Sequence, residues 1–342
     1  MRRIKILLWG IILSGTVLTF HHYYLKLYGA NVKRSGYLLI PTGSTYEEVL
    51  NRVTIFLKDP EAFTWVAEKK NYPQRVKSGK YALKAGEDNV TLVDRLRSGQ
   101  QEEVDVIFGG QNSIKEFTEK IAQQIELDST ALLKTILNPY YLKEHQVTTE
   151  NVQQLFISNT YKMYWNTSID FFLAQMIKEY HRFWNKTRRD KSNRLGMSVL
   201  QIITLASIVQ KEASKVDEMP KVAGLYLNRL RRHWKLQSDP TVLYAIKKMN
   251  PDHAPIKRVL YEDLQVASPY NTYLHHGLPP APICLPEISA INAVLDPTSH
   301  SYYYMVVSVK RPGYHEFSQT DLEHETHRHN YIRSLNEKNI RR

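Results

Sequence analysis

The chain has 342 residues, which is enough for a short N-terminal module and a second domain with a sizeable core. Hydrophobic residues make up 42% and charged residues 23%, so a disordered chain and a fibrous protein are both excluded. Lysine and arginine number 46 against 34 aspartate and glutamate, and the net charge of +12 favours an anionic partner: nucleic acid, acidic phospholipid or a carboxylate-rich cell-wall polymer. Cys284 is the only cysteine, which excludes an internal disulfide and a cysteine-based structural zinc site.

The first 24 residues combine an apolar run with charged and aromatic flanks. The run covers residues 6–20, and Ile4 with the tyrosine-containing segment 21–24 extends it to roughly the 20 residues that span a bilayer. Three basic residues precede it: Arg2, Arg3 and Lys5. Basic residues before a span keep that end in the cytoplasm, so the rest of the chain is expected on the other side. A cleaved signal peptide is the alternative, but no small-x-small cleavage site follows Phe20, so residues 1–24 are predicted to be an uncleaved anchor.

Residues 35–127 repeat a pattern of a short apolar strand, a turn and an amphipathic helix. The three copies cover residues 37–53, 79–96 and 104–125. A serine or threonine stands at each expected helix N-cap. The pattern predicts a small α+β module that resembles LysM-type glycan binders. Residues 128–195 are predicted to be an aromatic-rich helical connector, in which the basic stretch 188–194 is a surface loop.

A further helix is predicted from the N-cap Ser198 onward. Its apolar residues recur at helical spacing, and Glu212 shares a stripe with Leu205, Ile208 and Val209. Apolar neighbours disfavour the ionised form of a carboxyl group and raise its pKa, which suits a general acid near neutral pH. The alternative is that Glu212 is only the polar residue that ends a buried helix.

Four specific sequence blocks begin within this helix. They are Ala-Ser-Ile-Val-x-Lys-Glu at 206–212, Leu-Gln-Ser-Asp-Pro-Thr at 236–241, Ser-Pro-Tyr-Asn-Thr-Tyr at 268–273 and Gly-Leu-Pro-Pro-x-Pro-Ile at 277–283. With these blocks in this order, the chain resembles the YceG-like (MltG) family of endolytic murein transglycosylases over nearly its whole length. The resemblance implies an α+β protein with an N-terminal transmembrane helix, a small LysM-like module and a larger mixed α+β catalytic domain at 196–342.

The resemblance also implies an activity. Members of the family cut nascent peptidoglycan strands between MurNAc and GlcNAc without water and leave 1,6-anhydro-MurNAc ends. Their catalytic glutamate corresponds to Glu212, which would act first as a general acid and then as a base. No cofactor and no metal are implied. The implied partners are peptidoglycan glycan strands, the inner membrane and the peptidoglycan synthases, with the catalytic domain in the periplasm.

Polar and aromatic side chains in or near the motifs are expected to bind the sugar. They are Gln237, Ser238, Asp239, Thr241, Ser268, Tyr270, Asn271, Tyr273, His315, Ser318 and Thr320. Asp239 has an alternative role, because Asp-Pro-Thr before an apolar run is typical of an N-cap followed by proline at the first helical position. Residues 268–273 have the alternative of a proline-bounded structural turn, and the segments near 302–307 and 315–320 are predicted to be a strand pair. The sequence departs from the family pattern at Ser158, Lys162, Gln210 and Leu285.

Three other classes of function are less well supported. A metal-dependent hydrolase would use the C-terminal histidines, but their spacing lacks a two-histidine motif with a positioned glutamate: His315, His324, His327 and His329. A non-catalytic peptidoglycan-binding or scaffolding protein is the main alternative, and it would tolerate Glu212→Gln. A nucleic-acid binder is disfavoured because the basic residues are spread along a chain that is expected to be exported.

Overall fold

The structure is a computed structural model that describes residues 2–254, 256 and 259–337. Its described part mixes α-helices with small two-stranded sheets, which confirms the predicted α+β class. The chain forms two compact units. Unit 1 contains residues 1–106, 123–127 and 161–168, and unit 2 contains residues 107–122, 128–160 and 169–342. The domain boundaries expected from the sequence stay predictions, and their outermost residues, 1 and 338–342, lie outside the described part.

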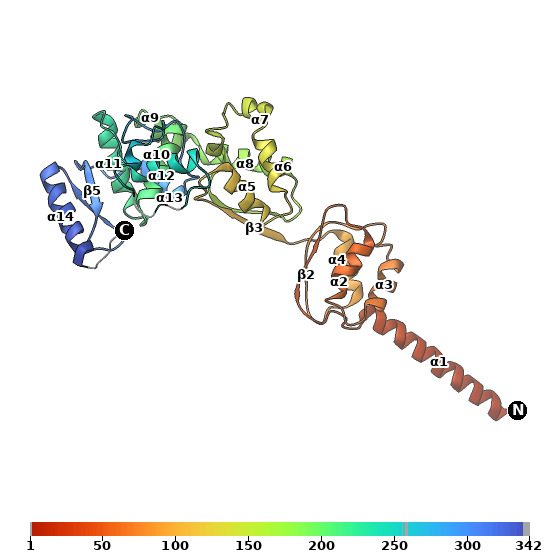
Figure 1. Cartoon of the computed structure of the whole chain (residues 1–342). Helices are drawn as coiled ribbons and strands as arrows, with labels where there is room; N and C mark the ends of the chain where they lie inside the picture. Colours follow the sequence, from red (N-terminus) through yellow and green to blue (C-terminus); the bar gives the residue numbers. More distant parts are fainter. Residues whose placement is uncertain (1, 255, 257–258, 338–342) are drawn as a thin grey trace. The chain divides into compact units, whose positions relative to one another are not determined.

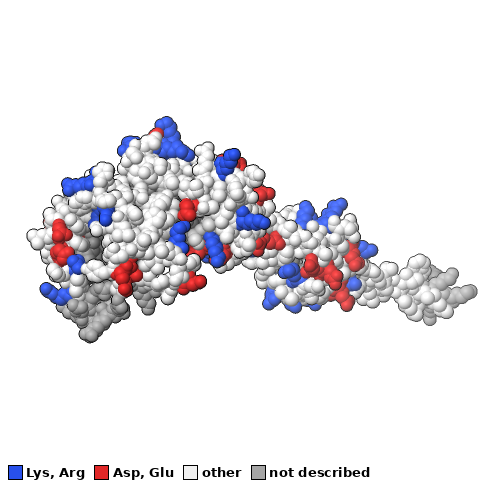
Figure 2. All heavy atoms as spheres, turned by 45° about the horizontal axis from the view of Figure 1, so that its top comes forward, with Lys and Arg blue, Asp and Glu red and all other residues white. Residues whose placement is uncertain are grey.

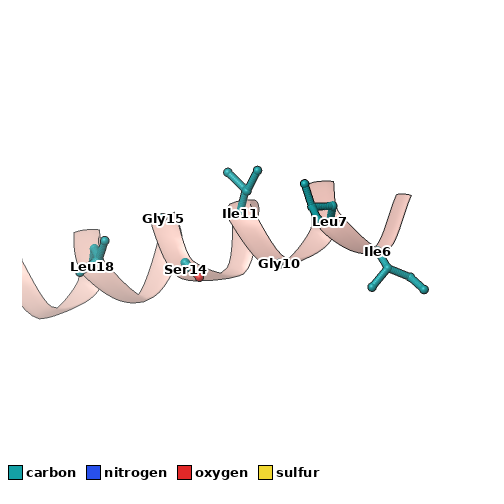
Figure 3. A pocket seen from close by; sticks show the side chains of 7 residues that line it. All are labelled: Ile6, Leu7, Gly10, Ile11, Ser14, Gly15 and Leu18. Carbon is teal, nitrogen blue, oxygen red and sulfur yellow. The ribbon is translucent and has the colours of Figure 1, made fainter. Parts of the chain in front are cut away.

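Helix α1 (Arg2–Tyr28) extends from unit 1 as one continuous helix (Figure 1). Within the described residues, its segment Ile6–Tyr28 is long and apolar enough to cross a membrane, and its most apolar stretch is not buried in the protein. Figure 3 shows Ile6, Leu7 and Ile11 projecting from this helix around Gly10. The hollow that these residues line is bordered by α1 alone, so it is the surface of a single apolar helix rather than an enclosed cavity. A bare apolar surface of this length fits a lipid environment.

The core of unit 1 lies between a two-stranded sheet and three helices. The elements are β1 (Gly36–Ile40), β2 (Gly79–Leu83), α2 (Tyr46–Thr54), α3 (Pro60–Lys69) and α4 (Asn89–Ser98). The strands pair antiparallel, from Gly36 opposite Leu83 to Ile40 opposite Gly79. Alternate strand residues and the apolar helix faces are buried, and Phe63 and Tyr81 at the centre are 0% exposed.

The three predicted strand–turn–helix copies are confirmed, because β3 (Glu103–Phe108) and α5 (Ile114–Ala122) follow the two pairs in unit 1. Helix α3 was missed. The predicted N-cap is correct at Thr45, where a capping box forms with Glu48. It is wrong at α4, which is capped by Asp88 rather than by a serine or threonine. An aspartate side chain satisfies the first free N–H groups equally well.

The segment predicted to be a helical connector contains helices and one strand. They are α6 (Ser129–Ile136), α7 (Pro139–Glu144), the short 3-10 helix Val152–Leu155, β4 (Asn159–Tyr164), α8 (Ile169–Phe183) and α9 (Lys186–Arg194). Strand β4 pairs with β3. The surface loop expected at 188–194 is wrong, because these residues belong to α9. Asn185 caps this helix by accepting from the N–H of Arg188, and Lys186 pairs with Asp190 one turn later.

The largest core of unit 2 is built around α10 (Val199–Glu212), where the predicted helix is confirmed. Ser198 caps it in a capping box with Gln201, and residues 202–209 are all buried. Helix α10 packs against α11 (Met219–Arg231) and α13 (Ile288–Leu295). Because these three helices bury one another's apolar faces, the end of α10 is held firmly in the core.

The C-terminal part of unit 2 contains a strand pair and a helix that lie side by side (Figure 1). The predicted strand pair is confirmed by β5 (Tyr304–Val307) and β6 (His315–Ser318), in which Tyr304 lies opposite Ser318. Helix α14 (Asp321–Glu337) follows. Figure 2 shows lysine and arginine side chains in several separate groups with acidic side chains between them. The visible face therefore carries no single basic stripe of the kind that follows a nucleic-acid backbone.

Candidate active site

Glu212 is the last residue of α10 and lies at the edge of the main core of unit 2. Leu205, Ile208 and Val209, which share its stripe, are each 0% exposed. The residue that follows it, Ala213, is 1% exposed and ends the helix by donating its N–H to the carbonyl of Val209. A carboxyl group at this position is therefore surrounded by protein atoms on most sides and is largely desolvated.

Two hydroxyl groups donate to the same oxygen of Glu212. The Tyr226 hydroxyl on α11 lies 2.8 Å from Oε1, and the Ser238 Oγ lies 2.5 Å from Oε1. Tyr226 is 1% exposed and Ser238 is 0% exposed, so neither hydroxyl is exchanged for water. Burial raises the pKa of Tyr226 well above its ordinary value, so this residue stays a hydrogen-bond donor at all physiological pH values. No donor to Oε2 of Glu212 occurs among the described residues.

The pKa of Glu212 is raised above the usual value for glutamic acid. Desolvation by the surrounding protein is the largest cause, and the negative charge of Asp239 acts in the same direction. The hydrogen bonds from Ser238 and Tyr226, and the positive charge of His315, oppose this rise. The net direction is the one predicted from the apolar stripe of α10, and it favours a protonated Glu212.

The backbone next to Ser238 is held in an unusual conformation. Gln237 has φ = 50°, in the left-handed region that non-glycine residues seldom adopt. Two hydrogen bonds to Thr272 hold this turn, one from the N–H of Gln237 to the carbonyl (3.1 Å) and one from the N–H of Ser238 to Oγ1 (3.0 Å). Thr241 Oγ1 also donates to the carbonyl of Ser238 (2.6 Å). The turn is thus fixed on the loop 268–273, and this fixing aims the Ser238 hydroxyl at Glu212.

Asp239 does not cap the helix that follows it. Helix α12 (Asp239–Met249) begins at this residue, Ser238 occupies the N-cap position, and no side-chain capping bond forms. The carboxylate of Asp239 instead accepts a hydrogen bond from the Tyr273 hydroxyl at 2.6 Å. The capping interpretation is therefore wrong by one residue, since the N-cap position belongs to Ser238. Ser238 makes no capping bond because its hydroxyl donates to Glu212. Pro240 is accordingly the second residue of α12 rather than the predicted first, but it still lies in the first turn.

His315 at the start of β6 adds an imidazole to this neighbourhood. Its Nδ1 lies 2.8 Å from Oε2 of Glu218, and its backbone N–H donates to Oε1 of the same carboxylate, also at 2.8 Å. The positive charge of the His315 ring influences the pKa of Glu212, so the two side chains share one electrostatic environment. Four elements of unit 2 therefore supply the site around Glu212: α10, α11, the start of α12 and β6.

Sequence similarity to known proteins identifies the family of the chain. The sequence model of the YceG-like family matches residues 38–330. The chain belongs to the YceG-like family. It is 28% identical over 319 residues to the endolytic murein transglycosylase of Bacillus subtilis (strain 168), a match that covers 87% of this chain and 85% of that protein.

Two further relatives support the assignment. The endolytic murein transglycosylase of Streptococcus pneumoniae (strain R6) is 26% identical over 313 residues, covering 82% of this chain and 55% of the relative. This chain therefore spans about half the length of the pneumococcal protein. The crystal structure of a YceG-like protein from Listeria monocytogenes is similar, with 25% identity, a TM-score of 0.58, and coverage of 86% of this chain and 98% of that one.

In the present chain, the side chains of the motif at 268–273 mainly contact other residues of the same unit. The amide of Asn271 donates to the carbonyls of Leu264 and Val266, each at 2.9 Å. Ser268 Oγ accepts from the N–H of Tyr270 (3.3 Å), and the Tyr270 hydroxyl donates to a carboxylate oxygen of Glu150 (3.2 Å). These contacts favour the structural-turn alternative for the three residues, and a role for them in binding sugar stays a prediction.

Two predicted site residues near the C-terminus also have local partners. Ser318 Oγ lies 3.1 Å from Nδ1 of His327, and it is 1% exposed. Thr320 Oγ1 accepts from the N–H of Glu323 (3.3 Å) at the beginning of α14. Ser318 therefore connects β6 to α14, whereas Thr320 satisfies a backbone N–H in the first turn of α14. Within the described residues, no group of three or more histidine, cysteine, aspartate or glutamate side chains is arranged to hold a metal ion.

The sequence interpretation missed three side chains that organise this site. Tyr226 donates to Glu212, Glu218 holds His315, and Arg229 joins two segments by donating to the carbonyls of Tyr303 (2.7 Å) and Leu236 (2.5 Å). A signal for two of them was present. Val222, Tyr226 and Arg229 stand four and then three residues apart, so they lie on one face of α11. A tyrosine and an arginine on an apolar face need buried hydrogen-bond partners.

Proposed function

We propose that this YceG-like protein is an endolytic murein transglycosylase that cuts peptidoglycan glycan strands between MurNAc and GlcNAc and leaves 1,6-anhydro-MurNAc ends. The names of the Bacillus and Streptococcus relatives support the activity. The observation that carries the proposal for this chain is the setting of Glu212, a desolvated carboxyl group with a raised pKa and two buried hydroxyl donors on one oxygen.

The arrangement of donors assigns different roles to the two oxygens of Glu212. In a protonated carboxyl group, one oxygen carries the proton and the other is the better acceptor. Because Tyr226 and Ser238 both donate to Oε1, the proton belongs on Oε2. Oε2 can then donate to the glycosidic oxygen, O4 of the departing GlcNAc, as the bond from that oxygen to C1 of MurNAc breaks.

The same carboxyl group completes the reaction as a base. After protonating O4, Glu212 is a carboxylate, and its hydrogen bonds with Tyr226 and Ser238 stabilise the new charge. The C6 hydroxyl of MurNAc attacks C1 of its own ring, and Glu212 accepts the proton that this hydroxyl loses. One C–O bond breaks, one forms, no water is consumed, and Glu212 is protonated again at the end.

One carboxyl group is sufficient for this chemistry. Hydrolytic glycosidases use a second carboxylate as a nucleophile or to activate water. Here the attacking hydroxyl belongs to the substrate, and intramolecular attack has a large advantage in effective concentration. Asp239, the nearby acid, accepts a hydrogen bond from Tyr273 (2.6 Å) and is assigned a role in shaping the site.

The proposal also includes the N-terminal part. Helix α1 would anchor the protein in the inner membrane, with the basic residues that precede the apolar run in the cytoplasm and the catalytic domain (196–342) in the periplasm. The module at 35–127 would bind glycan strands in the manner of LysM-like modules. The peptidoglycan synthases, which make the nascent strands, are the protein partners that this placement favours.

Digestion of purified glycan strands by the full chain in detergent micelles tests the activity. Mass spectrometry of the new ends should identify 1,6-anhydro-MurNAc. Reducing ends would mean that the protein is a hydrolase, and intact strands that remain bound would mean a non-catalytic peptidoglycan-binding protein. Glu212→Gln should bind strands without releasing anhydro products, and Glu262→Gln, which changes an exposed glutamate of unit 2, should cut like the wild type.

A further inference from the structure

The buried carboxylate of Glu218 contacts His315 at the edge of the site. Glu218 and His315 have side chains that are only 5% and 12% exposed. Both oxygens of Glu218 contact the same residue, Oε1 the backbone N–H and Oε2 the ring Nδ1, each at 2.8 Å. A pair of contacts from one carboxylate to one residue fixes the position of the strand and the rotation of the ring together.

This contact determines where His315 carries a proton. An ionised carboxylate only accepts hydrogen bonds, so Nδ1 must be the donor. In the neutral ring Nε2 is then the acceptor, and in the charged ring both nitrogens are donors. When the ring is charged, the Glu218 carboxylate is its ion-pair partner.

The loop before β6 is fastened to the segment between α10 and α11 at two other points. Ser214 Oγ donates to the carbonyl of Gly313 (3.0 Å), and the Tyr314 hydroxyl donates to Asp217 (3.0 Å). His315 therefore has a fixed place beside the end of α10. The charged groups on the segments packed against it are Glu212, Lys215, Asp217, Glu218 and Lys221.

We propose that Glu218 is a positioning residue, which holds His315 with Nδ1 protonated so that the ring opposes the negative charge that forms on Glu212 during proton transfer. This inference deepens the proposed transglycosylase function and rests on it. Glu218 never contacts the sugar and acts only through His315. The pair would help Glu212 to release its proton to the leaving oxygen and to wait as a carboxylate until the C6 hydroxyl attacks.

Glu218→Gln is the main test, because an amide of equal size has only one acceptor oxygen. Whichever way the amide is turned, its NH2 group faces one of the two donors of His315, so one contact is lost. Glu218→Gln should be compared with the wild-type full chain and with three other variants: His315→Gln, the double variant, and Glu262→Gln as a control at an exposed acid of unit 2. The pH profile of kcat/KM for anhydro-product release and the thermal unfolding of each variant should be measured.

We expect Glu218→Gln to lower kcat about 10- to 100-fold, which is the range for loss of the orienting partner of a metal-binding histidine. The basic limb of kcat/KM should also move to higher pH, because the positive charge of His315 lowers the pKa of Glu212 in the intact protein. His315→Gln and the double variant should show the same shift, whereas Glu262→Gln should keep the wild-type profile. If Glu218→Gln loses activity but the basic limb of kcat/KM does not move, Glu218 has only a structural role and the proposal is overturned.

A spectroscopic measurement separates this inference from the proposed function. The chain has 13 histidines, so the ring signals of His315 must be identified by their absence from spectra of His315→Gln. Nitrogen-15 shifts should place the proton of the neutral ring on Nδ1 in the wild type and move it toward Nε2 in Glu218→Gln. An unchanged ring in Glu218→Gln would refute the positioning role. Absence of anhydro products from the wild type would instead refute the proposed activity.

Discussion

Glu212 and Glu218 stand on either side of the turn between α10 and α11, but their carboxyl groups have opposite surroundings. Glu212 meets two neutral hydroxyls on one oxygen, and its other oxygen has no donor among the described residues. Glu218 uses both oxygens on one histidine. The first carboxyl group therefore keeps an oxygen available for proton transfer, and the second has its hydrogen-bonding capacity committed to His315.

Burial alone does not mark an acid for catalysis. Glu218 is 6% exposed, and it is the more completely buried of the two residues. What differs is the chemical nature of the partner. The partners of Glu212 are neutral hydroxyls, which leave a desolvated acid that resists ionisation. The partner of Glu218 is an imidazole, which can carry a compensating positive charge.

The largest effect is expected from Glu212→Gln. The amide oxygen can still accept from Tyr226 and Ser238, so the fold should be kept, but no proton can be transferred. Loss of a general acid and base lowers rates by about 10²- to 10⁴-fold. Release of anhydro-muropeptides should fall by at least this factor while strand binding persists. Wild-type turnover in this variant would show that Glu212 is not the general acid and base.

Ser238→Ala should have the next largest effect. It removes one of the two donors that oppose the rise in the pKa of Glu212, so the basic limb of kcat/KM should move to higher pH. A hydrogen bond to a charged group contributes about 1.5–3 kcal/mol, so the carboxylate intermediate should be less stable and kcat about 10- to 100-fold lower. Thr241→Ser is the matched control, because it keeps the hydroxyl that donates to the carbonyl of Ser238. A limb that moves to lower pH in Ser238→Ala would contradict the geometry.

The sequence predicted α10 and the position of Glu212 at its end well because the information is local. An apolar stripe at helical spacing specifies a buried helix, and the last residue of the stripe must then lie at its edge. The partners of Glu212 could not be predicted in this way. Tyr226 and Ser238 are 14 and 26 residues away along the chain, and their approach depends on how α11 and the turn at Gln237 pack.

The errors in the prediction have a similar origin. Asp239 matched the pattern of an N-cap, but its side chain contacts Tyr273, which is 34 residues distant. The polar stretch 188–194 has no apolar stripe, so its helix depends on the cap at Asn185 and on the contact of Arg188 with the ring of Phe183. Local patterns therefore predict the elements, whereas tertiary contacts determine which polar side chains meet.

A third prediction concerns stability and separates the two glutamates without any substrate. Because the pKa of Glu212 is raised in the folded state, the folded protein binds this proton more tightly than the unfolded chain does. Stability from this group is complete below the unfolded pKa and is lost as pH rises toward the folded pKa. Glu212→Gln mimics the protonated form, so its melting temperature relative to the wild type should increase as the pH rises above the usual pKa of glutamic acid. Glu218→Gln should show no such gain, because it breaks a contact with His315.

The smallest effect is expected at Gln237, whose left-handed backbone (φ = 50°) aims Ser238 at Glu212. Glycine adopts this conformation without a steric penalty, whereas alanine does not, so Gln237→Gly should be about 1 kcal/mol more stable than Gln237→Ala. Denaturant unfolding of both variants measures the difference. The glycine variant should keep the basic limb of the wild type, because Thr272 still holds the turn at the N–H groups of residues 237 and 238. Equal stability of the two variants would mean that the turn relaxes out of the left-handed region, and the setting of Ser238 would then need no strained residue.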